Sequence, residues 1–120
     1  MSIDPLNRFS SVPTIAEETQ ETGLTNGPTQ VTLSPVIPCV WGKRIHIMCS
    51  STGDLTDILL QFTGGYNQLS TAVSLATVVT AGADPVIIKY DAGMGQTVQL
   101  VGTKAGATTG TALAWIAVLS

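Results

Sequence analysis

Side chains that could carry out chemistry are few and widely separated in this 120-residue chain. His46 is the single histidine, so one chain cannot supply a histidine pair for acid–base catalysis or for a metal site. No Gly-x-Ser-x-Gly motif marks a serine nucleophile, and Gly93-Met94-Gly95 alone is too weak a motif to indicate phosphate binding. We therefore expect a protein that is not an enzyme and that needs neither a cofactor nor a metal.

Two aspartates and two cysteines are the other candidate ligands for an ion. Asp54 and Asp57 flank a turn, but a loop calcium site needs more oxygen ligands at closer spacing, so we interpret them as solvated turn residues. Cys39 and Cys49 could form a disulfide between adjacent strands or remain two free buried thiols. The second interpretation is favoured because no export signal is visible.

Aromatic side chains offer a different function, since rings can stack on sugars. The four candidates are Trp41, Tyr66, Tyr90 and Trp115. Trp115 lies in a segment that is apolar on both faces, so packing in a core or an interface is expected for it. Tyr66 lies in a glycine-containing loop and is the best candidate for an exposed contact with a partner. His46 is expected to be exposed or in an interface, beside Arg44 and Met48.

Charge is scarce and unevenly placed. Charged residues make up 11% of the chain, against about 25% in an average soluble domain. The net charge of −3 arises before residue 31, and the rest of the chain is balanced, without a Lys/Arg cluster that would bind nucleic acid. The longest apolar run, Ala112 to Leu119, is too short to cross a membrane. Extensive contact with other subunits, rather than with nucleic acid or a membrane, explains the low charge best.

Short strands separated by turns are expected over most of the chain. The predicted strands are Thr29–Ile37, Lys43–Ser50, Leu55–Phe62, Leu69–Val79, Val86–Tyr90, Gln96–Val101 and Thr111–Leu119. A helical period also fits the third and fourth segments, but β-branched residues and the neighbouring strands favour strand. About seven or eight antiparallel strands predict an all-β fold, either a β-sandwich or a small barrel.

The C-terminal segment, Gln96 to Ser120, predicts one long β-hairpin around a glycine-containing loop. Its second strand is apolar on both faces, so each face should be covered by a second sheet or by another subunit. The face chosen as the predicted oligomer interface consists of Ala112, Ala114, Ile116 and Val118.

An extended arm, residues 1–28, is expected to precede a β domain at residues 29–120. Three prolines and a polar run without apolar periodicity favour an arm, although one helical turn at Ile15–Thr19 is an alternative. Apolar residues recur at every third position and would anchor the arm to a surface. These predicted anchors are Ile3, Leu6, Phe9, Val12 and Ile15.

This layout resembles the small virion structural proteins of tailed bacteriophages, and within them the capsid decoration, or cement, proteins. The residues that carry the resemblance are the proline-punctuated segment up to Pro28 and the apolar segment from Gln96 to Ser120. The resemblance implies a homotrimer that binds the major capsid protein or another virion protein, with the virion as its location. The arm would then bridge shell subunits. A tail or fibre module that binds glycans or a host surface is the alternative, and a neck or tail-completion protein also fits.

Overall fold

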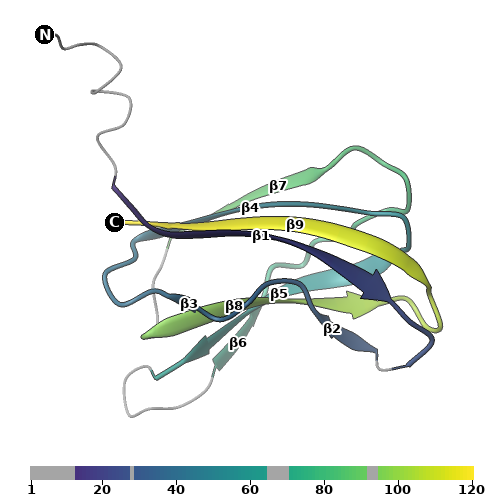
Figure 1. The fold of residues 1–120 in the computed structure, drawn as a ribbon, viewed down its shortest axis with the longest axis horizontal. Helices are drawn as coiled ribbons and strands as arrows, with labels where there is room; N and C mark the ends of the chain where they lie inside the picture. Colours follow the sequence, from purple (N-terminus) through teal and green to yellow (C-terminus); the bar gives the residue numbers. More distant parts are fainter. Residues whose placement is uncertain (1–12, 28, 65–70, 92–94) are drawn as a thin grey trace, which may run out of the picture.

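The chain folds as an all-β sandwich, which confirms the predicted fold class. The computed structural model describes residues 13–27, 29–64, 71–91 and 95–120, and these form nine strands in two antiparallel sheets (Figure 1). Sheet A has the order β1 (Thr14–Leu24), β9 (Gly110–Leu119), β4 (Arg44–Ser51) and β7 (Val86–Tyr90). Sheet B has the order β2 (Gln30–Thr32), β8 (Thr97–Lys104), β5 (Leu55–Thr63) and β6 (Thr71–Ser74), and β3 (Ile37–Pro38) also pairs with β8.

The core lies between the two sheets and follows from the period of two in each strand. In β4 the residues Ile45, Ile47 and Cys49 point inward and are at most 1% exposed. In sheet B the inward side chains include Leu60 and Phe62 of β5. Each large apolar side chain buried in this way contributes about 1.5–3 kcal/mol to folding, so the two sheets are held together chiefly by this layer.

The C-terminal segment is not a hairpin, which corrects the sequence prediction. Strand β8 belongs to sheet B and β9 to sheet A, and both are central strands of their sheets. Residues 105–109 therefore connect the two layers, which lie about 10 Å apart in sandwiches. Gly106 and Gly110, with φ of 63° and 136°, provide the backbone angles that this crossing requires. Each strand has its own row of inward side chains, and the two rows face each other across the core.

Strand β1 corrects the predicted domain boundary at residue 28. It pairs antiparallel with β9 along its whole length, from Thr14 beside Leu119 to Leu24 beside Gly110, and is an integral edge strand of sheet A. Neither an arm nor a helical turn forms there. Ile15, predicted as an arm anchor, is half-buried and packs against the core. The other anchors, Ile3, Leu6, Phe9 and Val12, lie outside the described residues.

Candidate interaction surface

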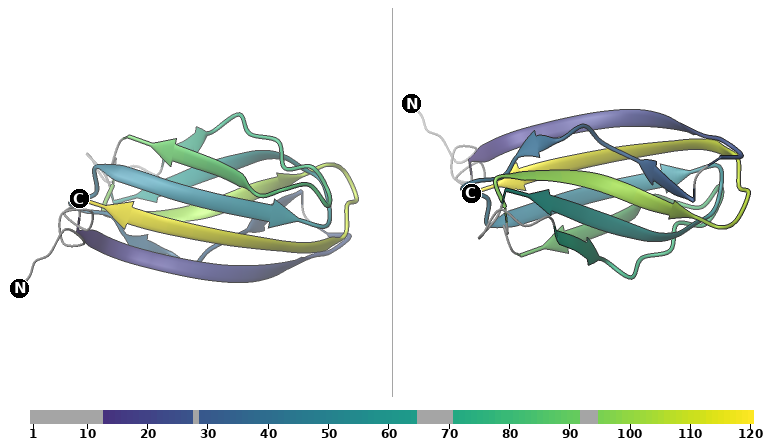
Figure 2. Two further views of the ribbon diagram at one scale, coloured as in Figure 1. Left: turned by 90° about the horizontal axis from the view of Figure 1, so that it is seen from above. Right: turned by 90° about the horizontal axis from the view of Figure 1, so that it is seen from below.

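The outward side of sheet A presents a regular grid of side chains, which we call the A face. Figure 2 shows β1, β9, β4 and β7 side by side in sheet A. Strand pairing places the outward side chains in rows across these four strands. The rows are Glu17–Ala117–His46–Lys89, Thr19–Trp115–Met48–Ile87 and Glu21–Leu113–Ser50, with Pro85 directly before β7. The face therefore combines residues that lie up to 100 positions apart in the sequence.

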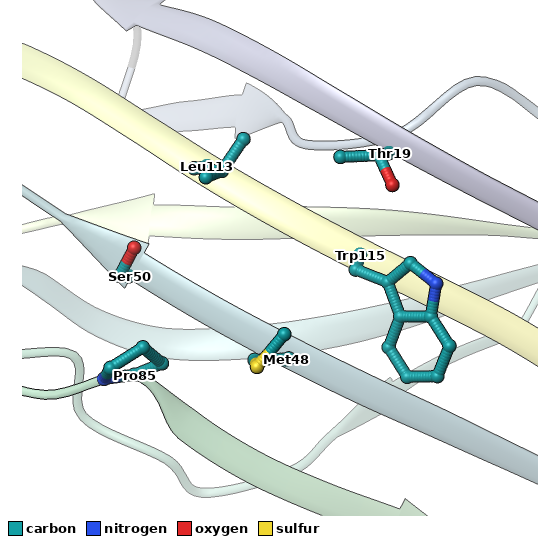
Figure 3. A pocket seen from close by; sticks show the side chains of 6 residues that line it. All are labelled: Thr19, Met48, Ser50, Pro85, Leu113 and Trp115. Carbon is teal, nitrogen blue, oxygen red and sulfur yellow. The ribbon is translucent and has the colours of Figure 1, made fainter.

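The centre of the A face is apolar although it faces away from the core. Ile87 is 71% exposed, Leu113 47% and Met48 42%, and Trp115 is half-buried beside them. Met48, Leu113 and Trp115 border a groove of about 290 Å³, shown in Figure 3, and Ile87 lies next to Met48 in strand register. The groove is lined by Thr19, Met48, Ser50, Pro85, Leu113 and Trp115. Because the outward face of an antiparallel sheet usually carries polar residues, an apolar centre of this kind indicates an interaction surface.

Trp115 is held in place by a hydrogen bond across the A face. Its indole Nε1 donates to Oε2 of Glu17 on β1, at 2.5 Å. A bond to a charged acceptor is shorter and stronger than one between neutral groups. The ring is therefore oriented beside the groove before any partner arrives, which lowers the entropy cost of binding.

The charges of sheet A are separated to opposite sides. Three glutamates, Glu17, Glu18 and Glu21, lie on edge strand β1. Near the other edge, a second hollow of about 330 Å³ is lined by Lys43, Arg44, His46, Lys89 and Asp91. The side chains of Arg44 and Lys89 make no hydrogen bond or ion pair with another described residue. The basic side of the face is thus available to an acidic group of a partner.

A second exposed apolar region lies at one end of the sandwich, in the loop between β3 and β4. Trp41 is 78% exposed and Val40 56%. Gly42 donates its N–H to the carbonyl of Cys39 at 2.9 Å, and a Cβ at Gly42 would lie only 2.5 Å from Val118 Cγ1. This turn accepts only glycine at that position without rearrangement and directs its apolar tip toward solvent.

Residue 13 and the C-terminus meet at the same end. The N–H of Ser120 donates to the carbonyl of Pro13 at 3.0 Å, and the N–H of Lys43 donates to the carbonyl of Leu119 at 2.8 Å. The segment before Pro13 therefore joins the sandwich next to the Trp41 loop. Of the aromatic residues considered from sequence, Trp41 is the fully exposed one in the described chain, while Tyr66 lies outside the described residues.

The four residues predicted as an oligomer interface lie in the core. Ala112, Ala114, Ile116 and Val118 are at most 2% exposed, and sheet B of the same chain covers them. The strand was expected to be covered on both faces, but within the described chain sheet B covers only the face that holds these four residues. The outward face of β9, with Leu113 and Trp115, is the one that remains open.

Asp54 is exposed, as expected of a solvated turn residue, whereas Asp57 is half-buried in β5, and both also accept hydrogen bonds within the chain. Asp57 accepts hydrogen bonds from the N–H of Ile58 at 2.8 Å, the N–H of Thr77 at 3.3 Å and the hydroxyl of Ser74. Asp54 accepts from the N–H of Ala81 at 2.7 Å. Together they fasten the end of β6 and the segment that follows it to sheet B. Within the described residues no three His, Cys, Asp or Glu side chains gather as a metal site.

Cys39 and Cys49 are free buried thiols. Burial raises the pKa of the Cys49 thiol to about 11 and also raises the pKa of Cys39. Because a thiolate is the reactive form, both groups are suited to packing and not to nucleophilic or redox chemistry. The described residues also contain no helix that is long and apolar enough to cross a membrane.

Comparison with known proteins identifies relatives in fold alone. No family model matches the sequence, and no curated protein is similar to it. Among solved structures, the SPBc2 prophage-derived protein YomS has a TM-score of 0.50 and 14% identity, over 88% of this chain and 96% of that one. A chain from the structure of infectious bursal disease virus Gt strain has a TM-score of 0.43 and 12% identity, over 90% of this chain and 32% of that one. At this level of identity the likeness to the prophage-derived protein shows a shared fold and assigns no role.

Proposed function

We propose that this chain is a non-enzymatic virion structural protein that decorates or cements a phage capsid shell. The observation that carries the proposal is the shared position of residue 13 and the exposed Trp41 loop at one end of the sandwich. A terminal segment and an adjacent exposed aromatic ring together form a natural attachment end, because buried aromatic residues dominate binding energy at interfaces. The fold shared with a prophage-derived protein supports the same class.

In this mechanism the attachment segment is residues 1–12, and Ile3, Leu6, Phe9 and Val12 insert between subunits of the major capsid protein. Ile15 takes no part, because it packs in β1. Trp41 would contact the same shell beside the point where the segment joins the domain. Binding to the assembled shell alone would stabilise that shell by mass action. The sandwich itself would form oligomers on the shell, as the low charge content predicts.

The test is co-sedimentation with empty capsid shells of the virus that encodes the chain. Two variants are compared with the intact protein: deletion of residues 1–12, and Trp41→Ala. The deletion ends before β1, so the sandwich should keep its thermal unfolding midpoint. We expect the deletion to abolish sedimentation with shells and Trp41→Ala to weaken it about 10- to 100-fold. Undiminished attachment of both variants would overturn the proposal.

A glycan-binding or host-surface module is the second candidate, and the exposure of Trp41 is the observation that favours it, since an exposed indole can stack on a sugar ring. That function predicts binding to a glycan array that Trp41→Ala abolishes and that deletion of residues 1–12 leaves unchanged. The two candidates therefore respond oppositely to the deletion.

A further inference from the structure

We propose that the A face is the contact surface for a second copy of this chain, related by a two-fold axis that runs parallel to the strands. The inference supplies the geometry of the oligomer within the proposed function. It is tested without any capsid, so either conclusion can fail without the other.

The apolar centre of the A face supplies the first argument. Trp115, Met48, Ile87 and Leu113 form one continuous patch, in which Met48 lies directly between Trp115 and Ile87 in strand register. An exposed patch of this kind has an unfavourable free energy in water, which association with a matching apolar surface relieves. A second A face is such a surface, and it is present at equal concentration.

The charges decide how the second copy must lie. Two sheets that face each other can be related by a two-fold axis in the plane between them, either parallel or perpendicular to the strands. A perpendicular axis places each β1 opposite the β1 of the partner, so Glu17 and Glu21 would face the same glutamates across the contact. A parallel axis instead places β1 opposite β7. The acidic side then faces the basic side twice, once at each margin.

Within that arrangement the rows of the A face match one another. The row Glu17–Ala117–His46–Lys89 is reversed in the second copy, so Glu17 faces Lys89 of the partner subunit. In the next row Trp115 faces Met48 of the partner subunit, with the sulfur close to an aromatic ring, a contact that is favourable. The pairing uses Lys89, whose ammonium group has no partner among the described residues of the monomer.

The available area is sufficient for a stable contact. Four strands about 4.8 Å apart and about eight residues long cover roughly 500 Å² on each copy, or roughly 1,000 Å² in total. That total reaches the size at which specific interfaces begin. Two twisted sheets that face each other usually pack with their strands about 30° apart. A dimer formed in this way would have four layers of sheet, and the contact between the two A faces would be its third interior, after the cores of the two sandwiches.

The experiment is a charge-reversal cycle read by mass in solution. Light scattering and sedimentation at about 100 μM should give twice the chain mass for the intact protein, since a micromolar complex is formed at that concentration. Glu17→Lys and Lys89→Glu should each raise the dissociation constant about tenfold, because each sets like charges face to face. The combination of both changes should lower the constant again relative to either single variant, because opposite charges face each other once more. Recovery should be partial, because Glu17→Lys also removes the acceptor of the Trp115 indole N–H.

Two controls make the result specific. Ala72→Lys introduces a charge on the exposed outward side of sheet B and should leave the mass unchanged. Deletion of residues 1–12 should also leave it unchanged, because the proposed contact uses only residues from Glu17 onward. The proposal would be overturned if the intact protein were a monomer at about 100 μM, or a trimer of the kind implied by the phage resemblance. It would also be overturned if the combined variant showed no recovery, or if deletion of residues 1–12 abolished the dimer.

Discussion

The two outward faces of the sandwich follow the same strand alternation and yet differ in character. On the outward side of sheet B, called the B face, small polar residues predominate. Its rows are Gln30–Thr103–Asp57, Thr32–Val101–Leu59–Ser74, Gln99–Gln61–Ala72 and Thr97–Thr63. The A face has four large apolar side chains at its centre and opposite charges at its margins.

Hydrogen bonding separates the faces further. On the B face, Asp57 binds Ser74 and the backbone of Thr77, while Gln99 Nε2 donates to the carbonyl of Ser34 at 3.1 Å. These polar groups are satisfied within the chain. On the A face, Arg44 and Lys89 have no such bonds to described residues. The polar groups of the B face are thus satisfied within the monomer, whereas the A face leaves apolar side chains and two cations exposed.

The largest expected effect comes from a charge at the centre of the A face. Met48→Glu places a carboxylate opposite apolar side chains of a second copy, and a buried unpaired charge costs several kcal/mol. We expect the dissociation constant of the dimer to rise at least about 100-fold, so that sedimentation gives a monomer. The monomer should stay folded, because Met48 is 42% exposed and lies outside the core.

The matched change on the B face is Ala72→Glu, at an exposed position of β6. It should leave the mass in solution unchanged and should change the free energy of unfolding by no more than about 0.5 kcal/mol. If Ala72→Glu dissociated the protein and Met48→Glu did not, the roles assigned to the two faces would be exchanged.

A smaller effect is expected from the hydrogen bonds that complete the B face. Asp57→Ala leaves the N–H groups of Ile58 and Thr77 and the hydroxyl of Ser74 without this acceptor. We expect the free energy of unfolding to fall by about 1–3 kcal/mol. Urea denaturation in the monomeric Met48→Glu background measures this without a contribution from association.

Asp84→Ala is the control, because Asp84 is an exposed loop residue and its side chain makes no hydrogen bond or ion pair with another described residue. Its change should stay within about 0.5 kcal/mol. Equal losses from the two variants would mean that the bonds of Asp57 do not set it apart from a solvated aspartate.

Much of the fold could be predicted from sequence, because a period of two fixes which side chains share a face. For β4 the alternation correctly placed Ile45, Ile47 and Cys49 on one side. Alternation does not fix which strand is the neighbour, so β8 and β9 were wrongly paired with each other. Nor does it tell inward from outward when both faces are apolar, and the two faces of β9 were therefore reversed.

Strand β1 was missed for a different reason. Its sequence is polar at every position from Glu17 to Thr22, since an edge strand outside the centre of the sheet buries little. This polar run, together with the prolines on either side of the strand, favoured an extended arm in the sequence analysis. The A face itself depends on contacts between β1 and β9 at long sequence separation, such as Glu17 with Trp115, which no local pattern reveals.

The smallest expected effect concerns the hydrophobic core, which lies between the two sheets. Cys49 is the inward neighbour of Met48, and its pKa is raised from an ordinary 9.0 to about 11 because burial penalises the thiolate. The folded chain thus holds this proton more tightly than the unfolded chain. Its contribution to stability is complete below about pH 9 and is lost as the pH rises towards about 11, with a loss of about 1.4 kcal/mol by pH 10.

Urea denaturation at pH 7, 9 and 10 in the Met48→Glu background measures this loss, with Cys49→Ala as the matched variant that should lack it. Cys39 contributes a slope of the same sign, so Cys39→Ala and the double variant complete the set. If Cys49→Ala keeps the full slope, water reaches the thiol. The inward side of β4 would then be accessible to water, like the outward side. The difference in exposure between the two sides of β4 would be smaller than the 1% exposure of Cys49 indicates.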